Sequence, residues 1–136
     1  MEEQNWCQKD FPEVEVLALF FAASQYCLPT FLHSMQKLKV VVIYNYSSKC
    51  AILHGLSSLP PFTQIKSVLV ERLIVSPLCE YCRYSGSLEK LTVCLCEGLG
   101  NMTVLDKEQA SKFPNFLEIN FDHCSDLEEL PGKICN

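Results

Sequence analysis

The chain has 136 residues, of which 11 are basic and 16 acidic, and its formal net charge is −5. A negative balance without a basic run argues against a nucleic-acid groove, and the longest apolar stretch, residues 14–23, contains Glu15 and is about half as long as a membrane span. The first residues lack the charged-then-apolar layout of a secretory signal, so we expect a cytoplasmic or nucleocytoplasmic protein.

Residues 1–12 are mostly polar, and we expect them to form an incomplete coil or an N-terminal flank. Five stretches of residues 13–136 then share one spacing, in which an apolar residue is followed three and five positions later by two more. The triplets are Val14, Leu17, Leu19; Leu38, Val41, Ile43; Ile65, Val68, Val70; Leu88, Leu91, Val93; and Phe116, Ile119, Phe121. Residues two apart in a strand point to the same face. The pattern therefore predicts five strands, near 14–20, 38–44, 65–71, 88–95 and 116–122.

The triplets recur at steps of 24, 27, 23 and 28 residues, because their first positions are 14, 38, 65, 88 and 116. Steps of roughly 20–29 residues are typical of leucine-rich repeats, whose core spelling is L-x-x-L-x-L-x-x-N/C. Residues 88–96 and 116–124 match this spelling and end in Cys96 and Cys124. We expect both cysteines to contact backbone groups of neighbouring coils. The sequence thus predicts an α/β solenoid, an arc of about five coils with one curved parallel sheet.

Proline separates the expected strands. Leu28-Pro29, Leu59-Pro60 and Leu130-Pro131 each follow a strand, where proline stops further pairing and turns the chain toward the convex side. Phe31, Leu32 and Met35 are expected to form a short helical or 3-10 segment there, and Ile52 and Leu53 to rebuild the inner wall. The chain stops at Asn136, about where a sixth strand is expected, so the array is interpreted as truncated before a sixth coil.

Nine cysteines leave a zinc or redox module open as an alternative function. Cys79-x-x-Cys82 and Cys94-x-Cys96 have a zinc-like spacing, but the predicted strand directs Cys94 outward and Cys96 into the core, so no metal ligand is assigned. The three histidines fall in separate coils without a matching nucleophile, and we expect no catalytic activity. The sequons at Asn45 and Asn101 leave a secreted repeat protein as a further alternative.

Residues beside the inward pairs are expected to line the concave face of the sheet. Contiguous exposed apolar surface usually marks an interaction site, which favours the apolar members as a protein-contact patch. The alternative is that another domain covers them. Besides Ala18, the candidate contact residues are Phe20, Val42, Tyr44, Leu69, Glu71, Thr92, Cys94, Asn120 and Asp122.

Four stretches carry a resemblance to a known family: residues 11–19, with F-P-x-V-E-x-L-x-L; residues 28–41; L-E-K-L at 88–91; and residues 113–131, with F-P-N-x-x-E-I-x-x-x-x-C-x-D-L-x-E-L-P. They resemble the leucine-rich-repeat region of plant nucleotide-binding leucine-rich-repeat disease-resistance proteins. The similarity is strongest to the helper class, which carries a powdery-mildew-resistance-type coiled coil.

The resemblance implies a protein-recognition or autoinhibitory module of an intracellular immune receptor. Its implied partners are other domains of a parent receptor or lipase-like signalling heterodimers. No G-x-x-x-x-G-K-[ST] phosphate loop occurs in these 136 residues, so no nucleotide or other cofactor is assigned to them.

Overall fold

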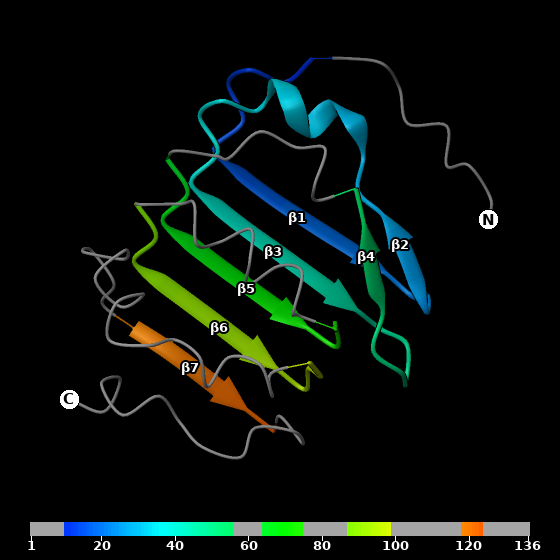
Figure 1. The fold of residues 1–136 in the computed structure, drawn as a ribbon. Helices are drawn as coiled ribbons and strands as arrows, with labels where there is room; N and C mark the ends of the chain where they lie inside the picture. The colour runs from blue at the N-terminus through cyan, green and yellow to red at the C-terminus, as the bar shows by residue number, and fades with distance from the viewer. Residues whose placement is uncertain (1–9, 56–63, 75–86, 99–117, 124–136) are drawn as a thin grey trace.

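Figure 1 shows the computed structural model of the chain, which describes residues 10–55, 64–74, 87–98 and 118–123. Five parallel strands form the main sheet in the order β1-β3-β5-β6-β7. Neighbouring strands in this sheet therefore follow one another along the chain, apart from the short strands β2 and β4, which form a separate sheet. The strands are β1 (Val16–Phe21), β3 (Val40–Asn45), β5 (Ser67–Glu71), β6 (Lys90–Cys94) and β7 (Glu118–Asp122). The predictions for residues 1–9, Cys79, Cys82, Asn101, Cys124 and the truncated C-terminal end lie outside the described residues.

Each of the five predicted repeats, here called a sequence unit, contributes one strand to the main sheet. The register of the sheet places the last two apolar residues of each triplet on common rows. Leu17, Val41, Val68, Leu91 and Ile119 are successive partners, and so are Leu19, Ile43, Val70, Val93 and Phe121. In these rows Val70 and Val93 are the most deeply buried of the described side chains, at 0% and 1% exposure. One face of the sheet is therefore the hydrophobic core, and the predicted parallel sheet is confirmed.

Each strand begins two residues after its predicted start. The predicted ranges included the first apolar position of each unit, which precedes the strand; in the second, third and fourth units this residue is buried, as Leu38, Ile65 and Leu88 show. A carbonyl just before the strand accepts two N–H groups from the following unit. Thus Glu15 O accepts from Lys39 N at 2.8 Å and Val40 N at 3.0 Å, and Lys39 O accepts from the equivalent pair one unit later.

The strands end differently in the first two units and in the last three. Arg72, Leu95 and His123, which follow β5, β6 and β7, have positive φ angles of 54°, 51° and 50°. These left-handed residues turn the chain out of the sheet. At the equivalent position of the first two units the chain stays extended, and Phe21 pairs with Asn45.

A second, two-stranded parallel sheet lies beside the C-terminal ends of β1 and β3 (Figure 1) and consists of β2 (Gln25–Cys27) and β4 (Ile52–His54). The sequence had predicted only a turn near Pro29. Ile52 was expected in the inner wall but is 40% exposed, because β4 alternates and buries Leu53 instead.

The connection from β2 to β3 contains a 3-10 helix, η1 (Thr30–Ser34), close to the predicted segment. Nowhere in the described residues is a helix long and apolar enough to cross a membrane.

Candidate contact surface

The face of the sheet opposite the core, here called the outward face, carries the residues that alternate with the buried rows. The register brings the predicted contact residues together in two rows. One row is Ala18, Val42, Leu69, Thr92 and Asn120, and the other is Phe20, Tyr44, Glu71, Cys94 and Asp122. For Asn120 and Asp122 the structure describes the strand position alone.

Three aromatic rings meet at the C-terminal end of β1 and β3. This aromatic cluster consists of Phe20, Tyr44 and Tyr46. Its ring centroids are 6.2 Å apart for Phe20 and Tyr44, 6.1 Å for Phe20 and Tyr46, and 4.7 Å for Tyr44 and Tyr46. Phe20 is 58% and Tyr46 62% exposed, although they are large apolar side chains. Water therefore reaches rings that already pack against one another, as is expected of a preformed contact site.

Tyr46 follows the predicted second strand, near 38–44, and was not among the predicted contact residues. The Tyr46 N–H donates to the Phe21 carbonyl at 2.7 Å, so pairing between the first two units continues past the end of β3. Continued alternation puts Tyr46 on the same side as Tyr44. The spacing of two residues between Tyr44 and Tyr46 was the sequence signal that could have placed Tyr46 on the same face.

The outward face changes from apolar to polar along the sheet. Val16 on β1 is 61% exposed, whereas Val42 and Leu69 are half-buried. Glu71 follows on β5 and forms an ion pair with Arg72 at 2.9 Å. Hydrogen bonding to Glu71, and secondarily burial, raises the pKa of the Tyr44 phenol. A polar rim thus adjoins the aromatic cluster, an arrangement common in protein interfaces.

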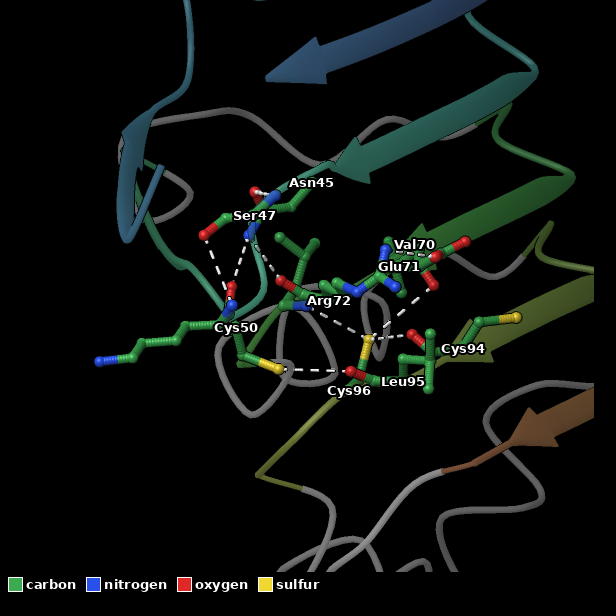
Figure 2. A network of polar contacts seen from close by, with 11 residues as sticks. Asn45, Ser47, Cys50, Val70, Glu71, Arg72, Cys94, Leu95 and Cys96 are labelled. Atoms are coloured by element: carbon green, nitrogen blue, oxygen red, sulfur yellow. Dashed lines mark hydrogen bonds and ion pairs between the residues drawn. The ribbon is translucent and has the colours of Figure 1, made fainter. Parts of the chain in front are cut away.

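Asn45 holds the loop that carries Tyr46 (Figure 2). The side chain is fully buried, and its Oδ1 accepts from the backbone N–H of Ala23 at 3.3 Å and of Ser47 at 3.0 Å. Its Nδ2 donates to the carbonyls of Lys49 at 2.9 Å and Arg72 at 3.1 Å. The Asn45 amide therefore connects the first three sequence units. It makes the backbone contacts expected of the last, N/C position of the repeat spelling, here called the polar slot.

This burial bears on the sequon at Asn45, which the secreted alternative would use as a glycan acceptor. A sugar on Nδ2 would replace one of the two N–H groups that donate to Lys49 and Arg72, and it would have to attach to a side chain that is 0% exposed. The folded chain is therefore not a glycan acceptor at this residue, and Asn45 gives no support to the secreted alternative.

Cys96 occupies the predicted polar slot of the fourth unit. Its buried sulfur accepts the Leu73 N–H at 3.4 Å, and Leu73 belongs to the preceding unit. Cys94, two residues earlier, points away from Cys96 (Figure 2), so the two thiols diverge as the strand assignment predicted. In the described ranges, no three His, Cys, Asp or Glu side chains are grouped so that they could hold a metal ion.

Comparison with known proteins finds relatives along nearly the whole chain, although no protein-family model matches it. The chain is 33% identical over 135 residues to the probable disease resistance protein At4g33300 of Arabidopsis thaliana, a match covering 99% of the chain and 16% of the relative. It is 32% identical over 130 residues to the disease resistance protein ADR1 of the same plant, covering 96% of the chain and 16% of the relative. The probable disease resistance protein At5g66890 is 34% identical, and the match covers 31% of it. The homologues are thus plant disease resistance proteins, and the chain spans about one sixth of the length of the first two.

Proposed function

We propose that the chain is part of the leucine-rich-repeat region of a plant nucleotide-binding leucine-rich-repeat disease-resistance protein of the helper class. In this proposal it acts as a non-enzymatic protein-recognition or autoinhibitory module. The homology to plant disease resistance proteins supports the immune role. The repeat spacing, and the strands that pair in register from unit to unit, support the leucine-rich-repeat solenoid.

The observation that carries the proposal is the exposed aromatic cluster on the outward face. Aromatic side chains are enriched at the energetic centres of protein interfaces, where a polar rim surrounds them. Phe20 and Tyr46 supply large exposed rings, and Val42 and Leu69 continue the apolar surface. Beyond them, Glu71, Thr92 and Cys94 form the polar side of the same face by register. Such a surface suits a protein partner better than a nucleic acid or a membrane.

The proposed partners are the other domains of a parent receptor or lipase-like immune signalling heterodimers. Nucleotide binding would belong to the parent receptor, because these residues contain no phosphate loop. In the autoinhibitory version, the aromatic cluster contacts another receptor domain and is covered in the resting state. We place the module in the cytoplasm or in the nucleus and cytoplasm.

The test measures binding of the purified chain to ADR1 that lacks its matching segment, with a lipase-like heterodimer as the second probe. Replacing Phe20 and Tyr46 by serine should weaken binding at least about tenfold, because both rings leave the centre of the interface. Ile52→Ser is the matched control, since Ile52 is also an exposed apolar residue but lies on the small sheet. Unchanged affinity in the double variant, or no binding of the wild-type chain to either probe, would overturn the proposal.

A second experiment separates autoinhibition from simple recognition. ADR1 is expressed in leaf tissue intact, without the matching segment, and with this chain in its place. Autoinhibition predicts cell death on deletion and its suppression by the inserted chain, but not by the Phe20→Ser, Tyr46→Ser version. Equal suppression by both versions would contradict an inhibitory role of the aromatic cluster.

A further inference from the structure

Arg72 follows β5, and its backbone is held by the units on both sides of it (Figure 2). Its N–H donates to the Cys94 carbonyl at 3.1 Å. Its carbonyl accepts from Ala51 N at 2.9 Å and from Asn45 Nδ2 at 3.1 Å. Both polar groups of this peptide unit are therefore bonded, and the Arg72 side chain extends from a fixed main chain.

The guanidinium of Arg72 is held as well, by two groups of the outward face. Nη1 donates to Glu71 Oε1 at 2.9 Å. Hydrogen bonding to Glu71 raises the pKa of the Tyr44 phenol, and a hydrogen bond from Arg72 partly offsets that rise. The guanidinium thus adjoins Tyr44, a member of the aromatic cluster. Because it is already held in place, binding a partner costs less side-chain entropy.

The ion pair between Glu71 and Arg72 presents mainly its positive member to water. The Glu71 side chain is 14% exposed and that of Arg72 31%. A basic side chain of a partner would also find the Glu71 carboxylate engaged by Arg72 and Tyr44. A guanidinium carries five N–H donors, of which these two contacts use a part. Further donors suit the two oxygens of a carboxylate, which a guanidinium binds in bidentate form.

We propose that the protein surface recognised by the aromatic cluster presents an aspartate or glutamate whose carboxylate binds Arg72, beside an apolar side chain that packs on Phe20 and Tyr46. This inference rests on the proposed function, because it names the chemistry of the partner at the same surface. Arginine and aromatic side chains are enriched at the energetic centres of protein interfaces. The net charge of −5 opposes an acidic partner at long range, but at about 0.15 M salt that repulsion is screened beyond about 8 Å, whereas a direct contact is kept.

The first test needs no knowledge of the natural partner. The isotopically labelled chain is titrated with the peptide acetyl-Leu-Glu-Leu-amide and with its uncharged analogue acetyl-Leu-Gln-Leu-amide, and NMR shifts of the Tyr46 and Arg72 amides report binding. The glutamate peptide should bind at least about threefold more tightly than the glutamine peptide, as expected of a partly exposed ion pair. Arg72→Gln should remove this preference, and Arg72→Lys, which keeps the charge but not the fork, should keep part of it.

Lys66→Gln is the matched control. It too removes one positive charge from an ion pair of 2.9 Å, but Lys66 precedes β5 and lies at the opposite end of the strand. This variant should keep the full preference for the glutamate peptide. Circular dichroism of each variant verifies that the sheet is retained.

The second test uses the two protein probes of the proposed function, ADR1 without its matching segment and the lipase-like heterodimer. Arg72→Gln should weaken the binding of a probe that the wild type binds by at least about fivefold, and Lys66→Gln should not. A folded Arg72→Gln variant with unchanged affinity for that probe would overturn the carboxylate contact and leave the proposed function standing.

If the wild type binds neither protein probe, the proposed function fails by itself, and the peptide titration decides the present inference. A glutamate preference that only Arg72→Gln abolishes would support it. No binding of the glutamate peptide, equal affinity for both peptides, or a preference that Arg72→Gln retains would overturn it.

Discussion

Replacing Asn45 by alanine removes the four hydrogen bonds that join the first three sequence units. In the described residues, the Ala23 N–H, the Ser47 N–H and the Lys49 carbonyl have no other partner, whereas the Arg72 carbonyl still accepts from Ala51 at 2.9 Å. Each lost bond costs about 1 kcal/mol net. Three lost bonds therefore lower the free energy of unfolding by about 3 kcal/mol, a large part of the total stability of a small domain.

Urea unfolding followed by circular dichroism measures this loss. A change of about 3 kcal/mol moves the midpoint by roughly 1–3 M, given urea dependences of about 1–3 kcal/mol per molar for small proteins. Ser48→Ala is the matched control, because Ser48 is an exposed neighbour in the same loop, and it should change stability by less than about 0.5 kcal/mol. If Asn45→Ala were as mild as this control, the buried amide would not be joining the units, and the reasoning would be refuted.

Three further predictions concern the core, a turn and an ion pair. Leu38→Ala should lower the free energy of unfolding by about 2–5 kcal/mol, since Leu38 is 1% exposed in the turn before β3; a loss below about 1 kcal/mol would contradict this packing. Leu95→Gly should stabilise the chain by about 0.5–1 kcal/mol, because Leu95 has a φ of 51° and glycine adopts a positive φ without strain. Ile52→Gly, in an extended strand, is the control and should destabilise the chain. A Leu95→Gly variant less stable than Ile52→Gly would exclude the left-handed turn. Hydrogen bonding to Lys39 and its charge lower the pKa of Glu15 from its ordinary 4.5. The stability advantage over Glu15→Gln should therefore be complete above pH 4.5 and disappear as the pH falls through the lowered folded-state value; urea titrations that show a pH-independent difference would contradict the pair.

The apolar rows of the sheet could be predicted because one physical rule produces them. The second and third residues of each triplet are two positions apart, so a strand must place both on one face. The same rule placed Phe20, Tyr44 and Glu71 on one row of the outward face. The predicted strand starts were two residues too early. The repeat spelling begins with an apolar residue that lies before the strand, and its apolar character does not distinguish a turn residue from a strand residue.

The polar slot of the second unit could not be located from the spacing. The spelling places it at Tyr46, eight residues after Leu38, but the buried amide is Asn45. This shift depends on backbone conformation: the chain stays extended through Asn45, whereas the equivalent Arg72 is left-handed. Because the shift also turns Tyr46 outward, one backbone difference accounts for both the missed core residue and the missed ring.

The most direct test of the account is a measurement of backbone proximities across the sheet by NMR on the isotopically labelled chain. The account predicts interstrand contacts that link Leu17 to Val41, Val41 to Val68, Val68 to Leu91 and Leu91 to Ile119, in that order. Contacts in a different order, antiparallel patterns, or helical contacts within these segments would contradict it. The outward face would then not be assembled from successive units, and the proposed contact surface would be lost with it.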